Sequence, residues 1–245
     1  VKNPKPFNPV NVGEGTNSDL NEYFPAVTAD GKQFLFTRGL KVPEIPDYEN
    51  EDFFMSNKTN GTWNAAQPIR EVNSQGNEGA PTLSADGNIM FFASCANEFD
   101  DYGAPDRKGY GSCDIFYSQK INGRWTRPRN AGTSINSNHW ETQPSFSSDG
   151  KTLYFIRGIR GRSGIRDQDI YSSTIGEDGK FSMAVKISTN VNTPGKEESV
   201  FIHPDNQTLY FSSDGHPGMG GLDIFMSRRE PGGDWAPAIN LGYPI

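Results

Sequence analysis

The clearest feature of the chain is a run of three consecutive apolar residues that recurs four times. Each run begins four residues after an aspartate that is preceded by Ala, Ser or Pro, and the runs are 34–36, 90–92, 153–155 and 209–211. Side chains alternate between the two faces of a strand, so three adjacent apolar residues predict a strand buried on both faces. The pattern therefore indicates sheets that are packed between other sheets.

Further strands are predicted around each apolar run. A short strand precedes the aspartate turn, at 25–28, 81–84, 144–147 and 200–203. A third strand of Asp, β-branched or aromatic residues and Ser follows, at 52–56, 114–118, 169–173 and 223–227. Dipeptides that tolerate positive φ come next, Asn60-Gly61, Asn122-Gly123, Asp178-Gly179 and Gly232-Gly233. The aromatic residues after these turns are expected to open a fourth strand, and they are Trp63, Trp125, Phe181 and Trp235.

These strands form a repeat. The copies open at glutamates spaced 56, 63 and 56 residues apart, Glu22, Glu78, Glu141 and Glu197. Four antiparallel strands with buried faces correspond to one propeller blade, and a repeat of this length is typical of such arrays. No stretch has helical periodicity, and 27 Gly and 17 Pro suit many turns. We therefore expect an all-β fold, a β-propeller of four-stranded antiparallel blades with four complete blade repeats, in a single domain spanning 1–245.

The two ends of the chain carry a second pattern. The stretch 9–17 repeats 128–136, which is the end of a fourth strand, and 235–245 carries another copy. In a closed ring of four blades, the two end segments cannot both occupy the same fourth-strand position. We therefore expect residues 1–20 to be the ring-closing outer strand of a fifth blade, whose inner strands would follow Ile245.

The repeat resembles a known family. The motifs 147–155 and 220–225, SSDGKTLYF and GGLDIF, are similar to the TolB-type, WD-like propeller repeat, and all four copies fit it. The combination of 140–144, 201–205 and 215–221 resembles more narrowly the propeller of multidomain OmpA-related envelope proteins. That resemblance implies helical repeats and a peptidoglycan-binding domain as neighbours, a link to secretion or gliding machinery, and a periplasmic, outer-membrane-associated location. The fourth copy departs at Val200 and Asn206, where the others have Pro and Gly.

Charge and composition narrow the function classes. A net charge of −7 disfavours a general nucleic-acid binder, because phosphate binding needs an organised excess of Lys and Arg. There is no apolar run near the ~20 residues of a membrane span and no initiating Met, so we expect a processed or excised piece. We expect Cys95 and Cys113 to lie near each other and to form a disulfide, which would indicate an oxidising compartment. Two buried free thiols are the alternative.

Candidate binding residues fall in the loops between second and third strands, which are long and unlike one another: 39–51, 96–112, 158–168 and 214–222. Such insertions usually carry function on a repeat scaffold. The first loop holds the weak Ca²⁺ candidates Asp47, Glu49 and Glu51, although a solvated acidic loop is the favoured interpretation. No other cofactor is expected.

The third loop is basic and is the preferred site for a protein partner. Arginine binds carboxylates and phosphates in a bidentate manner, and the residues are Arg157, Arg160, Arg162 and Arg166. The alternative is a solvent-exposed loop that pairs with the acidic loops beside it. Tyr102 and Tyr110 of the second loop are further candidate partner-binding residues. Together with Tyr48 and Phe99 they could instead stack on sugar rings.

Catalytic signatures are weak. The glutamates and third-strand aspartates recur once per copy, whereas a catalytic residue is needed once, so we interpret them as structural hydrogen-bond acceptors. The three histidines lack HExxH spacing, and no GxSxG motif occurs. We therefore predict a non-catalytic interaction or scaffold module of a bacterial envelope protein with an envelope or secretion-machinery partner. A glycan-binding or glycan-cleaving propeller is the alternative.

Overall fold

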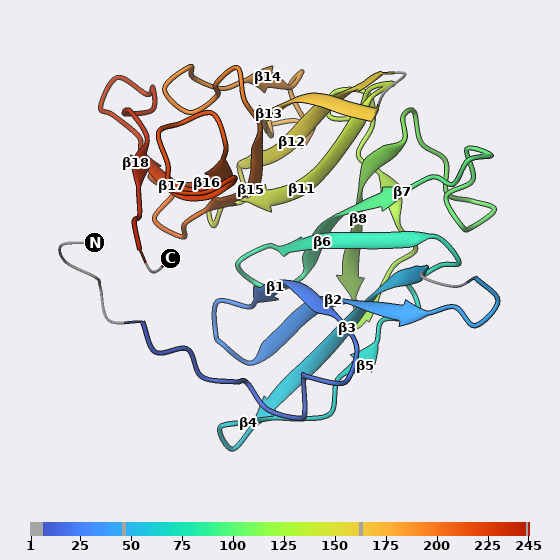
Figure 1. The fold of residues 1–245 in the computed structure, drawn as a ribbon. Helices are drawn as coiled ribbons and strands as arrows, with labels where there is room; N and C mark the ends of the chain where they lie inside the picture. The colour runs from blue at the N-terminus through green and yellow to red at the C-terminus, as the bar shows by residue number, and fades with distance from the viewer. Residues whose placement is uncertain (1–6, 46–47, 162–163, 244) are drawn as a thin grey trace.

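The computed structural model describes residues 7–45, 48–161, 164–243 and 245, and all regular elements in these ranges are β-strands (Figure 1). The four sequence copies form four antiparallel units, here called repeats 1 to 4. Repeat 1 contains β1 (Glu22–Val27), β2 (Gln33–Lys41), β3 (Glu49–Thr59), β4 (Thr62–Trp63) and β5 (Gln67–Pro68). Repeat 2 contains β6 (Asn77–Leu83), β7 (Ile89–Cys95), β8 (Cys113–Ile121), β9 (Arg124–Trp125) and β10 (Arg129–Asn130).

The other two repeats follow the same order. Repeat 3 contains β11 (Trp140–Phe146), β12 (Thr152–Gly161), β13 (Gly164–Thr174) and β14 (Val185–Lys186). Repeat 4 contains β15 (Glu197–Ile202), β16 (Thr208–Ser213), β17 (Asp223–Arg228) and β18 (Ile239–Asn240). Within each repeat, the strands pair antiparallel with their neighbours in the chain, except that β5 pairs with β3 and β10 pairs with β8. One parallel bridge, between Trp140 and Cys113, joins repeats 2 and 3 into a nine-stranded sheet.

The fourth strand differs from the prediction, because the chain after each hairpin turn forms short pieces instead of one strand. Trp63 and Trp125 lie in two-residue strands, whereas Phe181 and Trp235 make isolated bridges. A buried serine of the third strand explains the interruption. Ser118 Oγ, for example, donates to the Thr126 carbonyl at 2.6 Å, which takes the place of a ladder bond, and Ser56, Ser173 and Ser227 do the same in the other repeats.

The innermost strand of every repeat contains a β-bulge. At each bulge, two residues face one on the second strand, and the first of them has a positive φ near 50°. These residues are Phe24, Ala80, Gln143 and Ser199. Bulges bend a strand and increase its twist. In three repeats the bulge residue is followed by Pro. The bulge residue itself is of a different type in each repeat, so no single residue type in the sequence predicts the left-handed conformation.

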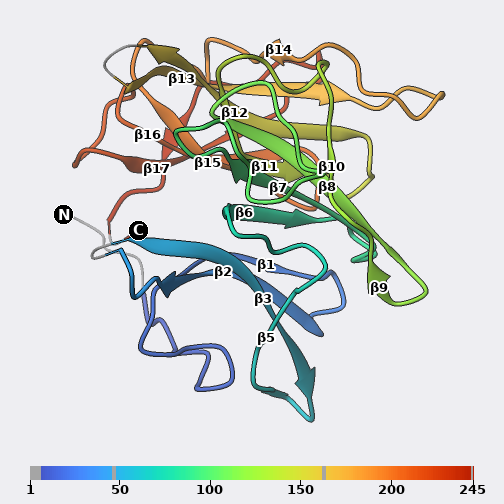
Figure 2. The same ribbon diagram turned by 90° about the vertical axis from the view of Figure 1, so that its right-hand side faces the viewer.

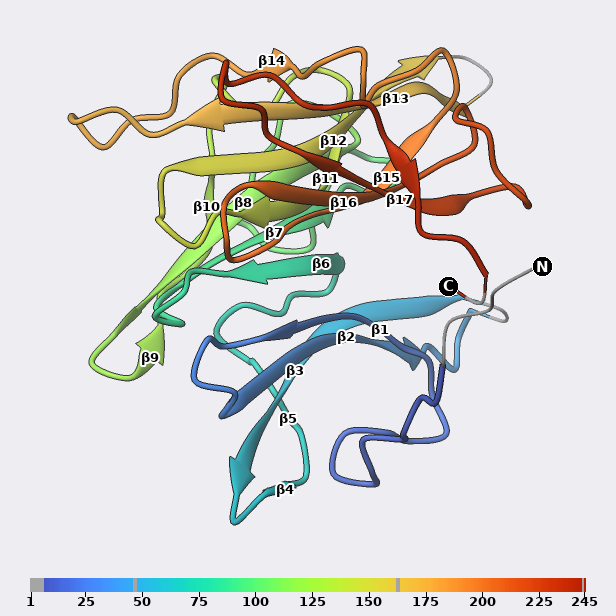
Figure 3. The same ribbon diagram turned by 90° about the vertical axis from the view of Figure 1, so that its left-hand side faces the viewer.

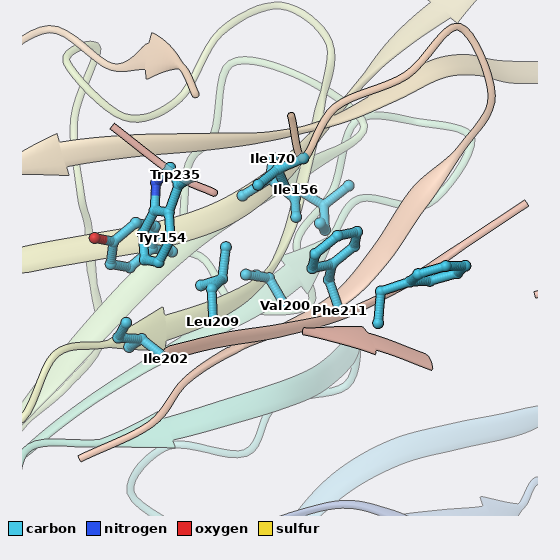
Figure 4. Close-up of a cluster of buried hydrophobic side chains, with 10 residues drawn as sticks. Tyr154, Ile156, Ile170, Val200, Ile202, Leu209, Phe211 and Trp235 are labelled. Atoms are coloured by element: carbon cyan, nitrogen blue, oxygen red, sulfur yellow. The ribbon is translucent and has the colours of Figure 1, made fainter. Parts of the chain in front are cut away.

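Three apolar clusters form the core, one between each pair of successive repeats. Figure 4 shows the third, where Tyr154, Ile156 and Ile170 of repeat 3 meet Leu209 and Phe211 of repeat 4. Burying such side chains contributes about 1.5–3 kcal/mol each. The prediction that each triplet is buried on both faces is confirmed for repeats 2 and 3. Phe34 in repeat 1 and Tyr210 in repeat 4 are only half-buried, because each faces an open end of the array.

Linkers between repeats are held by asparagines that are buried or half-buried. Asn136 accepts from the N–H of Ile115 at 2.8 Å and donates to its carbonyl at 2.8 Å, and Asn73 and Asn192 hold Phe53 and Ile170 in the same way.

The outer strand predicted in residues 1–20 is not observed: 7–21 lie outside the strands and 1–6 lie outside the described residues. Among the described residues, no third strand pairs with this segment. Among the described residues, no helix has the length and apolar character of a membrane span.

Candidate interaction site

The loops between second and third strands gather on one side of the molecule. Figure 1 shows the β2–β3 arm, the loop 96–112 and the β12–β13 arm all extending to the right, and Figure 2 views that side directly. We call this side the long-loop face. The arms exist because the β2–β3 and β12–β13 ladders continue beyond the packed sheet, to Lys41 with Glu49 and Gly161 with Gly164.

Buried carboxylates support the base of this face. Glu141 has no exposed side-chain surface; it accepts from the Ser137 hydroxyl at 2.5 Å and from Nε of Arg157 at 2.7 Å. Arg157 also donates to the Ile135 carbonyl at 2.7 Å and lies over the rings of Phe155 and Tyr171. Glu22 and Arg38 repeat this arrangement in repeat 1. The structure therefore contradicts the partner-binding role predicted for Arg157, since its guanidinium is engaged within the fold.

Repeat 2 fills this cation position from its loop, and in repeat 4 a loop histidine contacts the equivalent backbone carbonyl. In repeat 2 the second strand has Ser94 at this point, and Arg107 of the loop reaches back to pair with Glu78 and to donate to the Val72 carbonyl at 2.6 Å. In repeat 4, Nε2 of His216 lies 2.8 Å from the Val191 carbonyl. The sequence positions of Arg107 and His216 do not reveal these roles, because residues in loops of different lengths cannot be aligned between repeats.

Burial also changes the titration of these acids. Burial raises the pKa of Glu78 to about 7, although Arg107 and Ser74 act in the opposite direction. The pKa of Glu141 is raised for the same reason. Burial raises the pKa of Asp52 to about 6, and Asn50 provides the only opposing hydrogen bond. Three hydrogen-bond donors lie within 3.0 Å of the Asp114 carboxylate and oppose the effect of burial on its pKa: Tyr110 N, Gly111 N and Asn130 Nδ2.

The loop 96–112 is a rigid platform. A disulfide joins Cys95 to Cys113 at its base, where the two residues face each other across β7 and β8. Asn97 Oδ1 accepts from the N–H groups of Phe99 and Asp101. Tyr102 is buried under the loop, and its hydroxyl donates to the Gly111 carbonyl at 2.8 Å. The predicted contact role of Tyr102 is therefore contradicted, because the ring is part of the core.

Two aromatic rings remain exposed on this platform. Phe99 is 80% exposed and Tyr110 is 52% exposed. A large apolar ring costs free energy when it contacts water, and aromatic residues are enriched in protein interfaces. A pre-ordered loop loses little conformational entropy when it binds. Phe99 and Tyr110 are therefore suited to contact a partner.

The basic arm, β12–β13, extends on the same long-loop face as this platform (Figure 1). Arg160 and Arg166 are exposed near the tip of the β12–β13 arm, while Arg162 lies outside the described residues. Arg166 lies 3.8 Å from Asp167 of the same arm. Within the described ranges, no ion pair joins either arginine to the acidic loops. The guanidinium groups of Arg160 and Arg166 are therefore available to bind carboxylates or phosphates of another molecule.

The predicted Ca²⁺ ligands do not converge in the described part of the chain. Asp47 lies outside it. Glu49 accepts from Asn21 Nδ2, and Glu51 accepts from the Tyr23 hydroxyl at 2.6 Å. No group of three acidic, His or Cys side chains with metal-site geometry occurs among the described residues.

A groove of about 550 Å³ runs along the inner strands β1, β6, β11 and β15 of all four repeats. Its lining is mainly apolar and includes the four bulge residues. Gln143 accepts from the Ser199 N–H across two repeats. The described lining has no charged or histidine side chain, so it lacks the carboxylate pair of a glycosidase.

Comparisons with known proteins bear on the fold. No protein-family model and no curated protein sequence matches the chain. Among solved structures, TolB from Acinetobacter baumannii superposes with a TM-score of 0.52 and 15% identity, over 87% of this chain and 42% of that one. A candidate TolB from Agrobacterium tumefaciens gives 0.50 and 16%, over 86% and 59%. The catalytic domain of the Coprinopsis cinerea GH62 α-L-arabinofuranosidase gives 0.50 and 12%, over 88% and 67%.

These likenesses show an all-β, TolB-like propeller fold. The chain spans about half the length of the two TolB structures that it resembles. At such identities, the likeness carries no information about activity or partners, and one of the three structures belongs to an enzyme.

Proposed function

We propose that the chain is a non-catalytic interaction module of a bacterial envelope protein, in which each repeat is one propeller blade. The long-loop face binds a protein partner of the envelope or of a secretion machinery. The exposed ring of Phe99 on an ordered loop carries this proposal. A disulfide and the buried Arg107–Glu78 pair order a loop whose outermost ring is left in water, which is the arrangement of a pre-organised contact.

The basic arm supplies the electrostatic part of the same surface. Arg160 and Arg166 form charge-assisted hydrogen bonds with acidic side chains of the partner, while Phe99 and Tyr110 supply the apolar contact. Apolar and aromatic side chains near the centre of an interface usually contribute most of the binding free energy. Charged residues at the rim contribute mainly to association rate and orientation.

The proposed compartment is the periplasm, at the outer membrane. The disulfide between Cys95 and Cys113 supports it, since such bonds persist in oxidising compartments. The motifs 140–144, 201–205 and 215–221, which resemble OmpA-related envelope proteins, support the same location.

Affinity capture from an envelope extract tests the proposal, followed by titration of the purified, identified partner. We compare the wild type with Phe99→Ala and with Arg160→Ala/Arg166→Ala. Arg124→Ala is the matched control, because it is an exposed arginine beside the tight β8–β9 turn. We expect Phe99→Ala to weaken binding by at least about tenfold and the control to leave it unchanged. Equal binding by all four proteins would reject the long-loop face.

Glycan binding is the second candidate, favoured by the exposed Tyr110 and Phe99 rings, which could stack on sugars. Calorimetry with peptidoglycan fragments distinguishes the two functions. Saturable binding that is lost in Phe99→Ala and Tyr110→Ala, without a captured protein, would replace the protein-partner proposal.

A further inference from the structure

The array of repeats has two open ends. Packing between strands connects repeat 1 to 2, repeat 2 to 3 and repeat 3 to 4, and no comparable contact connects repeat 4 to repeat 1 in the described chain. Figures 1 and 3 show repeat 4 and repeat 1 separated on the side where the C-terminal end lies. The two sheet faces at these ends are the only repeat faces without a neighbouring repeat among the described residues.

The open face of repeat 4 has the composition of an internal interface. Ile224 is 40% exposed, whereas the residues at its position in repeats 1 to 3, Phe53, Ile115 and Ile170, are 0% exposed. Phe201, next to Tyr210 on the same face, is 51% exposed. An apolar strand position that is fully buried three times and exposed once indicates a missing neighbour.

The segment 11–17 has the geometry of a linker between two repeats. The N–H groups of Thr16 and Asn17 donate to the Gly13 carbonyl, as those of Ile135 and Asn136 donate to the Gly132 carbonyl. Asn11 Oδ1 accepts from Gly13 N at 2.7 Å, and Asn130 Oδ1 accepts from Gly132 N at 2.8 Å. The segment also docks on repeat 1 as the linker 130–136 docks on repeat 3, since Arg38 donates to the Thr16 carbonyl as Arg157 donates to the Ile135 carbonyl.

What this linker lacks is the strand that should precede it. In the other linkers, Asn73, Asn136 and Asn192 each hold both backbone groups of a third-strand residue of the preceding repeat. Asn17 occupies the same position, yet within the described chain its amide nitrogen has no hydrogen-bond partner. Val10 and Asn11 align with the outer strand Arg129–Asn130, and they pair with no third strand in the part of the chain that the structure describes.

The other end of the chain starts a linker of the same kind. Asn240 Oδ1 accepts from Gly242 N at 2.7 Å, which is the first turn of the linkers at Asn130 and Asn11. After Asn130 of repeat 2, this turn leads into the innermost strand of the next repeat, β11. The structure thus contains the beginning and the end of one further unit.

We propose that this open position is occupied by a further blade of the same polypeptide, encoded after Ile245. Its three inner strands pack against Phe201, Tyr210 and Ile224 of repeat 4. Its outer strand is Val10–Asn11, and Asn17 holds its third strand. The N-terminal segment thereby closes the ring. The inference rests on the proposed assignment of each repeat as a blade, and is independent of the partner-binding face.

Cysteine labelling in the complete natural polypeptide tests this proposal, with the native disulfide kept oxidised. Ile224→Cys reports on the open face, and Met183→Cys is the matched control on an exposed rim position of repeat 3. We expect a maleimide to label Cys at 224 at least about 100-fold more slowly than Cys at 183, since reaction would require local opening. Amide hydrogen exchange at Val10–Val12 should be slowed in the unmodified protein.

A second pair of variants tests the linker. Asn17→Ala and Asn136→Ala should each reduce the folding equilibrium constant of the complete polypeptide by about tenfold, because each removes two hydrogen bonds to a strand. Equal labelling at 224 and 183, or a natural chain with no residues beyond Ile245, would overturn the proposal. Protection at 224 that disappears on dilution would assign the face to a second copy and would also overturn it. Loss of partner binding alone affects none of these measurements.

Discussion

Removal of Arg107 tests how the loop 96–112 is ordered. Its guanidinium pairs with the fully buried Glu78, donates to the Val72 carbonyl at 2.6 Å and approaches Ser74 and Ser94 within 3.3 Å. Arg107→Ala leaves the Glu78 carboxylate buried without a cation. Breaking a buried pair in this way costs about 3–5 kcal/mol, a large part of the 5–15 kcal/mol typical of a domain.

The cost should depend on pH. Burial already raises the pKa of Glu78 to about 7, and loss of the guanidinium raises it further. A carboxyl whose pKa is higher in the folded state than in the unfolded state binds more protons when folded, so stability falls as pH rises between the two values. The deficit of Arg107→Ala should therefore be smallest near pH 5 and largest near pH 8. Adding Glu78→Gln removes the unpaired charge and should recover part of the loss.

Urea unfolding followed by tryptophan fluorescence at pH 5 and pH 8 measures these effects. Arg127→Ala is the control, because Arg127 and Asp106 form an ion pair in which both side chains are mostly exposed. That pair should contribute less than about 0.5 kcal/mol. A loss below about 1 kcal/mol for Arg107→Ala at both pH values would refute the reasoning. The disulfide would then be sufficient to order the loop.

We predict three further outcomes from other contacts in the structure. Because burial raises the pKa of Asp52 to about 6, this residue should contribute a loss of about 1 kcal/mol in stability, after allowance for partial exposure, as pH rises from 4 to 6; Asp52→Asn should make the slope in urea titrations shallower by that amount. Cys95→Ser/Cys113→Ser should lower stability by about 3 kcal/mol, seen as a lower melting temperature that no longer responds to reductant. Ser118→Ala should cost about 1 kcal/mol in urea, since the Thr126 carbonyl loses its 2.6 Å donor; a change within error would show that water replaces the hydroxyl.

Much of the architecture follows from local pattern. The triplets at 90–92 and 153–155 predicted strands buried on both faces, and both are. The recurrence of Glu78 and Glu141 predicted structural acceptors, and each accepts from a serine four residues earlier. These inferences succeed because strand alternation and short-range hydrogen bonds are set by residues close together in the chain.

The functional residues were harder to predict. Tyr102 lies in a variable loop, where no sequence feature distinguishes a surface ring from a buried one. Arg157 lies at the edge of such a loop, and the recurrence of an arginine at this position in repeat 1, Arg38, was the available signal for a structural role. The sequence feature that could have pointed to the structural role of Arg107 is Ser94 in the second strand. Where repeats 1 and 3 place an arginine, repeat 2 must take its cation from elsewhere.

The sequence alone therefore determined the repeat, the strand order within each repeat and the all-β class, because these depend on periodicities of two residues and of about 60 residues. Tertiary structure decided which loop arginines remain free, which aromatic rings are exposed and which repeat faces lack a neighbour. The physical reason is that burial depends on what packs against a side chain. Ile115 and Ile224 occupy the same strand position, yet one is buried and the other is exposed, since only one has a following repeat beside it.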